Sequence, residues 1–443
     1  MKKFLIIIIT KLIAKILRIL GKNAGNLPGN LALKWDKSIL NHFKITGKVI
    51  AVTGTNGKTM TNNCIAQILK DSGKKVVSNL QGNNMETGIL SALIKNCSLT
   101  GKIDADYLVF ETDESYVPVL YQKIPLDCLV VLNFFRDQLD RNGEMETLIL
   151  KIQKFLETYT GNLILNADDP NVSRLSKANL ENDNIYFYSV DKCEESTEEL
   201  HEAAEGTYCP FCRTKLQYEY YQYAHIGKFE CPECHYGKED IYQLLTKINV
   251  ENGTFTIGEN DYKTQYDSLY AFYDLAAATA MAKLYQIPEK SVRQTVEKFV
   301  LNNGRLEKLE VNHCKTTINL AKNPTGVNVS LKFLNKDPNP KELLFVLNDN
   351  VPDGKDVSWI WDIDFEKLEN VERVITAGLR PYDAAIRIKT AGYPLEKIIP
   401  CTSIKEAVDK LYETQNTKYI IANYTAIQNT RKEVLDYKES HEK

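Results

Sequence analysis

The sequence predicts an α/β protein whose first large domain has a parallel sheet, a phosphate-binding loop and an inserted zinc ribbon. Short β-branched runs alternate with helical stretches, which is typical of parallel βαβ units. A glycine loop follows the first of these runs, and two Cys-Pro-x-Cys pairs stand further along the chain. The strand-helix alternation starts again after residue 305, which predicts a second, Rossmann-like α/β domain.

Length and composition bound the domain count and the class of protein. The chain has 443 residues, of which 43% are hydrophobic and 26% charged, and its net charge is -3. This length allows two or three domains. Nucleic-acid-binding proteins are usually basic, so we expect no nucleic-acid partner. We place an N-terminal helix and linker at residues 1–44, a central domain at 45–305 with the ribbon at about 205–238, and a C-terminal domain at 306–443.

The N-terminus predicts an amphipathic helix. An apolar run at residues 4–9 is followed by basic residues that share one helical face: Lys11, Lys15, Arg18 and Lys22. Apolar side chains cover the opposite face: Leu12, Ile13, Ile16, Leu17 and Leu20. The apolar run is shorter than the roughly 20 residues that a transmembrane helix needs. Such a helix can lie on an anionic membrane surface or pack on protein, and the sequence favours neither.

The elements then follow in order. In the central domain we expect strands at 48–53, 75–77, 107–110, 128–132 and 162–165, with helices at 59–71 and 146–159. An acidic stretch at 191–205 marks the insertion, and hairpin strands at 241–250 and 253–257 lead into a helix at 269–284. The C-terminal domain has apolar segments at 343–347, 371–377, 384–391, 397–400, 404–414 and 419–422.

The glycine loop is the strongest chemical signal. Glycines let the backbone turn its N–H groups toward phosphate oxygens, and the N-terminus of the following helix adds positive potential. Lys58 would reach the terminal phosphates, and the Thr59 hydroxyl would bind Mg²⁺. We therefore expect ATP and Mg²⁺ as cofactors, bound by Gly54, Thr55, Asn56, Gly57, Lys58 and Thr59. Val52 stands where the general pattern has its first glycine, so the loop is short.

The two cysteine pairs predict a structural zinc site. The expected ligands are Cys209, Cys212, Cys231 and Cys234. Two such pairs at this separation are typical of a tetrahedral Zn²⁺ site, and four thiolates leave no open coordination position. A redox role is one alternative, and nucleic-acid binding by the ribbon is another. We expect the remaining six cysteines to be small buried hydrophobic residues.

The phosphate loop, Gly-Thr-Asn-Gly-Lys-Thr after Val-Thr, resembles that of the Mur ligase family. Further motifs follow in the family's order at residues 110–114, 133–140, 166–170 and 304–307. The resemblance implies a magnesium and catalytic role for Glu111 and a nucleotide contact for Arg305. This sequence departs from the family where Gln138 replaces a histidine and where Ala271 and Asp274 replace the asparagines of a nucleotide helix. We identify no lysine in this sequence as the counterpart of the carbamoylated lysine with which many Mur ligases bridge metal ions.

Within that family the chain looks most like the MurT subfamily, the synthetase subunits of lipid II isoglutaminyl synthases. Only about 47 residues precede the first strand, too few for the domain with which standard Mur ligases hold a UDP-linked precursor. The zinc ribbon and the motifs at 321–326 and 347–359 also fit the subfamily. The resemblance implies that ATP phosphorylates the α-carboxylate of D-glutamate in lipid II, and that ammonia from a GatD-like glutaminase subunit completes the amide.

A C-terminal aspartate is the other candidate catalytic residue. Asp349 follows the strand at 343–347, at the end where ligand groups gather in open α/β sheets. The resemblance suggests that an aspartate of this loop serves the glutaminase site or the ammonia step. Asp353 and Asp356 are competing choices, and a turn-capping role is the alternative.

Two other functions stay open: an amino-acid-adding ligase of the Mur or folylpolyglutamate type, and a non-catalytic nucleotide-dependent scaffold. The sequence has no secretory cleavage pattern, so we expect a cytoplasmic location. A membrane-bound substrate and the basic N-terminal helix would suit a peripheral position at the inner face of the plasma membrane.

Overall fold

The computed structural model describes residues 2–19, 25–79, 83–137, 145–200, 205–301 and 304–441. It divides into two compact units. The first holds the described residues of Met1–Phe134, Met145–Leu200 and Ala204–Phe299, and the second holds those of Phe135–Glu144 and Val300–Lys443. Leu20, Lys22 and Gln138, on which predictions fall, lie outside the described residues, as does the side chain of Arg18.

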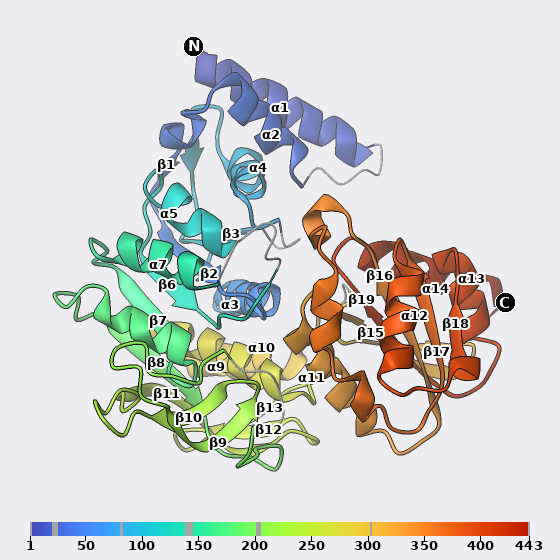
Figure 1. Cartoon of the computed structure of the whole chain (residues 1–443). Coiled ribbons are helices and arrows are strands. Elements are labelled where there is room, and N and C mark those ends of the chain that lie inside the picture. Colours follow the sequence, from blue (N-terminus) through green and yellow to red (C-terminus); the bar gives the residue numbers. More distant parts are fainter. Residues whose placement is uncertain are drawn as a thin grey trace. The chain divides into compact units, whose positions relative to one another are not determined.

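The first unit is built on a sheet of nine strands in the order β13-β12-β11-β8-β7-β6-β2-β5-β3 (Figure 1). Its parallel part consists of β2 (Lys48–Thr53), β3 (Val76–Ser78), β5 (Tyr107–Glu111), β6 (Cys128–Val131), β7 (Asn162–Asn166), β8 (Ile185–Val190) and β11 (Ile241–Asn249). Strands β12 (Thr254–Ile257) and β13 (Asn260–Lys263) add an antiparallel edge. A separate short parallel pair joins β1 (Lys44–Ile45) to β4 (Lys102–Ile103).

Two helices of the first unit, α1 (Lys2–Ile19) and α2 (Leu27–Trp35), come before its strands. The others lie among or after the strands: α3 (Lys58–Asp71), α4 (Glu86–Asn96), α5 (Val117–Leu120), α7 (Met145–Leu156), α8 (Pro170–Ser173), α9 (Leu269–Leu284) and α10 (Glu289–Lys298). Short 3-10 helices lie at Ile39–His42, Glu114–Tyr116 and Arg174–Lys177. The ribbon insertion contributes the hairpin β9 (Gln217–Tyr223) and β10 (Ile226–Glu230).

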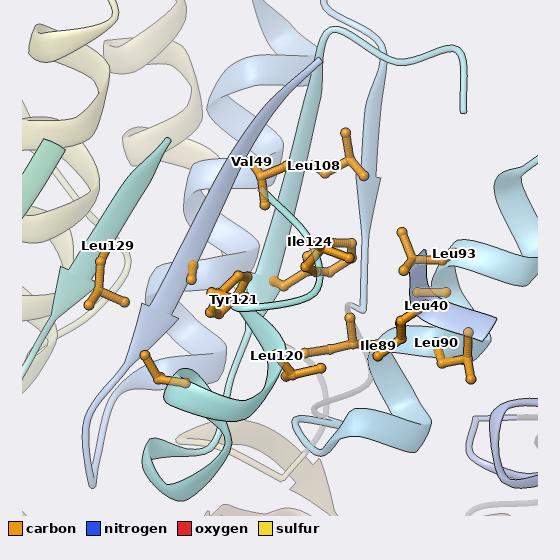
Figure 2. Close-up of a cluster of buried hydrophobic side chains, with 14 of the residues drawn as sticks. Leu40, Val49, Ile89, Leu90, Leu93, Leu108, Leu120, Tyr121, Ile124 and Leu129 are labelled. Atoms are coloured by element: carbon orange, nitrogen blue, oxygen red, sulfur yellow. The ribbon is translucent and has the colours of Figure 1, made fainter. Parts of the chain in front are cut away.

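The core of the first unit follows from the alternation of side chains along its strands. Val49 and Ala51 of β2 lie in one buried cluster with Leu108 of β5 and Leu129 of β6. Figure 2 shows part of this cluster, in which Val49 and Leu108 lie on their strands near Ile124, and the side chains of α4 that complete the cluster include Ile89 and Leu93. The intervening residues of β2 are buried against the other face, where α3 contacts α9 and α10. The phosphate loop therefore starts from a strand that is packed on both sides.

Helix α1 has two apolar faces rather than the single one that the sequence predicts. Ile6, Ile7 and Thr10 are buried where the helix packs on α2 and α4. Other apolar side chains of the helix are exposed: Phe4, Leu5, Leu12, Ile16 and Ile19. Of the apolar residues that the sequence places opposite the basic face, Leu12 and Ile16 are exposed, whereas Ile13 and Leu17 are partly buried. Among the described residues, no helix has the length and hydropathy to cross a membrane.

The second unit is a six-stranded sheet in the order β14-β15-β19-β16-β17-β18. The strands are β14 (Glu307–Val311), β15 (Cys314–Leu320), β16 (Lys341–Leu347), β17 (Val371–Gly378), β18 (Ile398–Pro400) and β19 (Thr417–Ala422), parallel except for β14. Helices α11 (Pro324–Asn335) and α12 (Pro381–Thr390) cover one face, and α13 (Ile404–Leu411) and α14 (Ile427–His441) cover the other. Short 3-10 helices lie at Val351–Asp353, Ser358–Asp362, Phe365–Lys367 and Leu395–Lys397.

Candidate nucleotide site and zinc ribbon

The phosphate loop connects β2 to α3 through two glycines with left-handed backbone. Gly54 has φ 130° and Gly57, the N-cap of α3, has φ 85°. A Cβ atom on Gly57 would lie 2.0 Å from Asp274 Oδ1, and one on Gly54 would lie 3.0 Å from the backbone of Asn133. Both the conformation and the close neighbours therefore require glycine. The loop thus has the glycine conformations on which the prediction depends, and phosphate binding by its N–H groups stays a prediction.

Asn133 holds the loop through both its backbone and its side chain. Its carbonyl oxygen accepts a hydrogen bond from Thr55 N at 2.9 Å, and its Oδ1 accepts one from Asn56 N at 2.9 Å. Its Nδ2 donates to the Asn56 carbonyl at 3.2 Å. Asn133 is the first residue of the motif at 133–140. The sequence therefore marked this residue, but it did not predict that Asn133 holds the phosphate loop.

Lys58 and Thr59 each contact a buried carboxylate. Lys58 Nζ lies 3.3 Å from Glu114 Oε2 and also donates to the carbonyl of Gly54. The Thr59 hydroxyl donates to Glu111 Oε2 at 2.6 Å. Glu111, Asp113 and Glu114 are all buried at the end of β5. A hydroxyl and carboxylate oxygens are the ligands that Mg²⁺ prefers, so the donor set fits the predicted ion.

Two asparagines orient Glu111, and sequence reasoning missed both. Asn79 pairs with the Glu111 backbone, since its Nδ2 donates to the carbonyl at 2.8 Å and its Oδ1 accepts from the amide at 2.9 Å. Asn84 Nδ2 donates to Glu111 Oε1 at 3.2 Å. Both residues lie between β3 and α4, where no motif marks them. The only signal in the sequence is their position after a strand that neighbours the phosphate-loop strand.

Asp274, one of the departures from the family pattern, lies beside the phosphate loop. The Thr61 hydroxyl donates to its Oδ1 at 3.1 Å, and Gly57 is its close neighbour. The following residues of α9 pack against α3. The position of the family's asparagine is therefore occupied by a buried carboxylate at the N-terminus of α3, where helix dipoles favour negative charge.

The four predicted zinc ligands come together at the base of the β9–β10 hairpin. Their sulfur atoms all lie within 4.8 Å of one another, and among the described residues they are the group of three or more His, Cys, Asp or Glu side chains that could hold a metal ion. The two knuckles are equivalent in detail: Arg213 and His235, which follow the second cysteine of each pair, both have left-handed backbone. In each knuckle their amide donates back to the carbonyl of the first cysteine. Four thiolates in this arrangement fit a tetrahedral Zn²⁺.

The three candidate aspartates of the C-terminal unit have different environments. Asp349 is partly exposed, and its Oδ2 accepts from Arg380 Nη1 at 3.3 Å. Asp353 is buried and holds Thr425, whose amide donates to its Oδ1 at 2.8 Å. Burial raises the pKa of Asp353. Asp356 caps the turn at Ser358, so Asp349 is the one whose carboxylate stands at the C-terminal end of β16 without a structural clamp on the backbone.

Arg305 lies in the second unit, directly after Gly304, which has φ 71°. Its predicted nucleotide contact stays a prediction. Glu307 of the same motif has a structural task instead, because both of its carboxylate oxygens accept from Arg431 at 2.7 Å. The motif at 321–326 also makes a contact within this unit, where Lys322 forms an ion pair with Asp137.

Comparison with known proteins decides the family. The MurT subunit of lipid II isoglutaminyl synthase (glutamine-hydrolyzing) from Staphylococcus aureus (strain COL) is 33% identical over 431 residues, which is 96% of this chain and 96% of that protein. The MurT subunit from Streptococcus pneumoniae (strain ATCC BAA-255 / R6) is 34% identical over 412 residues, 91% of this chain and 90% of that protein. This chain belongs to the MurT family.

Two family models match separate parts of the chain. Residues 52–232 match the Mur ligase middle domain, and residues 320–427 match the MurT ligase C-terminal description. The first match contains the phosphate loop and all but the last of the four cysteines, and the second contains Asp349. The predicted membership of this family is confirmed.

Solved structures support the fold of this MurT family member. A pseudomurein peptide ligase type C from Methanothermus fervidus superposes with a TM-score of 0.67 at 22% identity, covering 92% of this chain and 83% of that one. The MurF ligase from Thermotoga maritima, solved in complex with ADP, gives a TM-score of 0.60 at 15% identity, covering 95% and 84%. The predicted α/β fold of the Mur ligase type is confirmed.

Proposed function

We propose that this MurT family member is the ATP-dependent synthetase subunit that amidates the D-glutamate of lipid II to D-isoglutamine during peptidoglycan synthesis. The observation that carries the proposal is the pairing of a phosphate loop with buried carboxylates, in a chain similar over nearly its whole length to MurT subunits. The reaction class follows from the chemistry. A carboxylate becomes reactive toward ammonia when phosphorylation to an acyl phosphate supplies a leaving group.

The residues at the loop have complementary tasks in this proposal. The backbone amides of the phosphate loop and Lys58 would neutralise the charge of ATP phosphates. Thr59 and Glu111 would bind Mg²⁺, which supplies charge neutralisation at the transferred phosphate. Glu114 holds Lys58 near the loop while no phosphate competes for it. We place Arg305 on the nucleotide as well, by its similarity to the family motif.

The ammonia source is a GatD-like glutaminase subunit, with which the chain would form a heterodimer. Support comes from Asp349 and the surface around it. Several apolar side chains are exposed near the end of β16 and on the first turns of α12: Val351, Leu379, Tyr382 and Ile386. Exposed apolar clusters mark interaction surfaces. In this arrangement Asp349 would orient a glutaminase histidine, a task for which its exposure and its single arginine partner suit it.

The exposed face of α1 supports a peripheral position at the inner face of the plasma membrane, where lipid II would be met. Leu5, Leu12, Ile16 and Ile19 follow one another at intervals of seven, four and three residues, which places them on one side of the helix. Lys2 and Lys15 are exposed on the same helix. Deleting residues 2–19 should reduce binding to vesicles that contain anionic lipid, and unchanged binding would contradict this assignment.

The central test is a reconstituted reaction. The chain is incubated with a GatD-like glutaminase, glutamine, ATP and lipid II, and lipid II is analysed by mass spectrometry. Conversion of acid to amide lowers the mass by about one dalton, whereas an amino-acid-adding ligase would raise it by the mass of a residue. Lys58→Ala should abolish the conversion. Full amidation by Lys58→Ala would instead favour the scaffold function.

A further inference from the structure

The turn of the ribbon hairpin lies in the interior of the ATP-binding domain. His225 and the left-handed Ala224 form this turn between β9 and β10, at the end of the hairpin away from the cysteines. The His225 side chain is 1% exposed, and its Nε2 lies 3.4 Å from Asp169 Oδ1. Asp169 itself is fully buried. A histidine ring and a carboxylate that are buried in contact restrict each other's position, because neither can move away without disturbing the packing around it.

Asp169 connects this pair to the segment that clamps the phosphate loop. Its Oδ2 accepts a hydrogen bond from Phe134 N at 2.9 Å. Its Oδ1 accepts from Asn171 N at 2.8 Å, which caps α8. Phe134 follows Asn133, and Asn133 holds the amides of Thr55 and Asn56. An unbroken series of contacts therefore leads from the hairpin turn to the phosphate loop.

Two more contacts fasten the ribbon to the same place. Gly227 N of β10 donates to the Asp168 carbonyl at 2.9 Å. The hydroxyl of Tyr236, which lies just after the second knuckle, donates to the carbonyl of Pro170. Asp168 in turn accepts from Tyr273 at 2.8 Å, the residue next to Asp274 on α9. The turn Asp168–Asp169–Pro170 thus lies between the ribbon on one side and both supports of the phosphate loop on the other.

We infer that the zinc ribbon is a positioning element for ATP binding, and that His225 and Asp169 are positioning residues which hold Asn133 against the phosphate loop. The four cysteines would hold zinc at the base of the hairpin, and the hairpin places His225 against Asp169. The inference depends on the proposed function only for the identity of the nucleotide, because the contacts exist whatever phosphate the loop binds. A contiguous series of polar contacts of this kind can couple two sites, and the experiment below measures that coupling.

The test compares two histidines of the same ribbon in the full chain bound to its glutaminase partner. His225→Asn removes the ring from Asp169, whereas His235→Asn is the matched control. His235 is exposed, has left-handed backbone that asparagine tolerates, and pairs with Glu230 away from the central sheet. Asp169→Asn is the second variant, and zinc content is measured for all three. Hydrogen exchange then reports on the backbone amides of Thr55 and Asn56, both of which donate hydrogen bonds to Asn133.

We expect His225→Asn to keep its zinc, to expose the Thr55 and Asn56 amides to faster exchange, and to raise KM for ATP roughly tenfold with a smaller effect on kcat. His235→Asn should match the wild type in every readout. Faster exchange confined to residues 205–238, with KM unchanged, would overturn the inference. If the wild type bound no ATP, the proposed function would fail, but the exchange at Thr55 and Asn56 would still decide the coupling. If His225→Asn did not fold, Asp169→Asn would be judged by the same two readouts.

Discussion

The Thr59 hydroxyl and Glu111 Oε2 are 2.6 Å apart, joined by a hydrogen bond between the first turn of α3 and the end of β5. Asn84 and Asn79 hold Glu111 in place from a third segment. A hydroxyl and a carboxylate thus converge on one point beside the phosphate loop. When a cation binds there, both can turn from each other to the ion, which makes this pair the most direct place to test the proposed chemistry.

Thr59→Ala should raise the Mg²⁺ concentration needed for half-maximal amidation, because one of two proposed protein ligands is lost. We expect an increase of roughly tenfold, with Thr59→Ser close to the wild type. Glu111→Gln should lower kcat by about two orders of magnitude, since it removes the negative charge with which Glu111 would hold Mg²⁺ beside the transferred phosphate. The measurement is a Mg²⁺ titration of lipid II amidation. Equal Mg²⁺ dependence for Thr59→Ala and the wild type would contradict the assignment.

Gly57→Ala and Gly73→Ala separate backbone strain from crowding. The two glycines have nearly the same φ, 85° and 82°, but Gly73 has open space where Gly57 meets Asp274. Gly73→Ala should cost about 1 kcal/mol of unfolding free energy, the cost of left-handed alanine. Gly57→Ala should cost at least about 2 kcal/mol more and should also lose ATP binding. Denaturant unfolding and ATP titration of both variants check this. Similar losses in both would show that strain alone governs the position.

Cys231→Ala should release zinc and destabilise the first unit, because three thiolates cannot complete the tetrahedral site. We expect the midpoint of thermal unfolding to fall by roughly 5–10 °C. Cys193→Ala is the matched control, since Cys193 belongs to the same insertion but lies outside the quartet. Metal analysis of the purified chains, with thermal unfolding, is the measurement. One equivalent of zinc in Cys231→Ala would disprove the ligand set.

The roles of the three candidate aspartates can be distinguished by measuring amidation with two nitrogen sources, glutamine and added ammonium. Asp349→Asn should abolish amidation with glutamine and leave amidation with added ammonium within about twofold, as expected for a residue that serves the partner's site. Asp356→Asn should have little effect on either rate, because the exposed Asp356 only caps a turn. Asp353→Asn should lower stability, since Asp353 holds Thr425. Loss of both rates in Asp349→Asn would place this residue in the ammonia step instead.

The buried pair of Glu342 and Lys418 should make the second unit acid-sensitive. Their side chains are 1% and 0% exposed and lie 3.0 Å apart, and Arg373 also binds Glu342. Burial would raise the pKa of Glu342, but hydrogen bonds from Arg373 and Lys418 outweigh it and lower that pKa. A lowered carboxyl pKa means that its stabilisation is present above the ordinary glutamate range and is lost as the pH falls through the folded pKa.

Glu342→Gln should therefore cost about 3 kcal/mol at neutral pH and should differ less from the wild type as the solution becomes acidic. Glu366→Gln is a control, because that carboxylate binds Arg387 but is more than half exposed. Unfolding free energies at several pH values give the comparison. A difference between Glu342→Gln and the wild type that stayed constant with pH would show that the charge of Glu342 is not responsible.

Local sequence patterns were enough to predict many of the strands and helices. The β-branched run of β2, the glycines after it and the periodicity of α3 predicted the strand, loop and helix in place, and the alanine-rich helix at 269–284 was predicted with the bounds that α9 has. Strands β14 and β15 were missed, because mixed polar and apolar segments show their strand character only beside their neighbours. Strand β8 was also missed, although its β-branched and aromatic residues favour a strand. Helix α1 was placed on the right residues, but the face it buries depends on α2 and α4.

The sequence by itself determined the phosphate loop, the four cysteines and the order of motifs, because each depends on residues a few positions apart whose chemistry acts locally. Only the tertiary structure decided which distant residues serve them. Asn79 and Asn84 reach Glu111, Asp274 meets Gly57, and His225 meets Asp169 across separations that no local pattern encodes. The physical reason is that sheet order brings the ends of separate strands to one edge, and burial then turns their polar side chains toward one another.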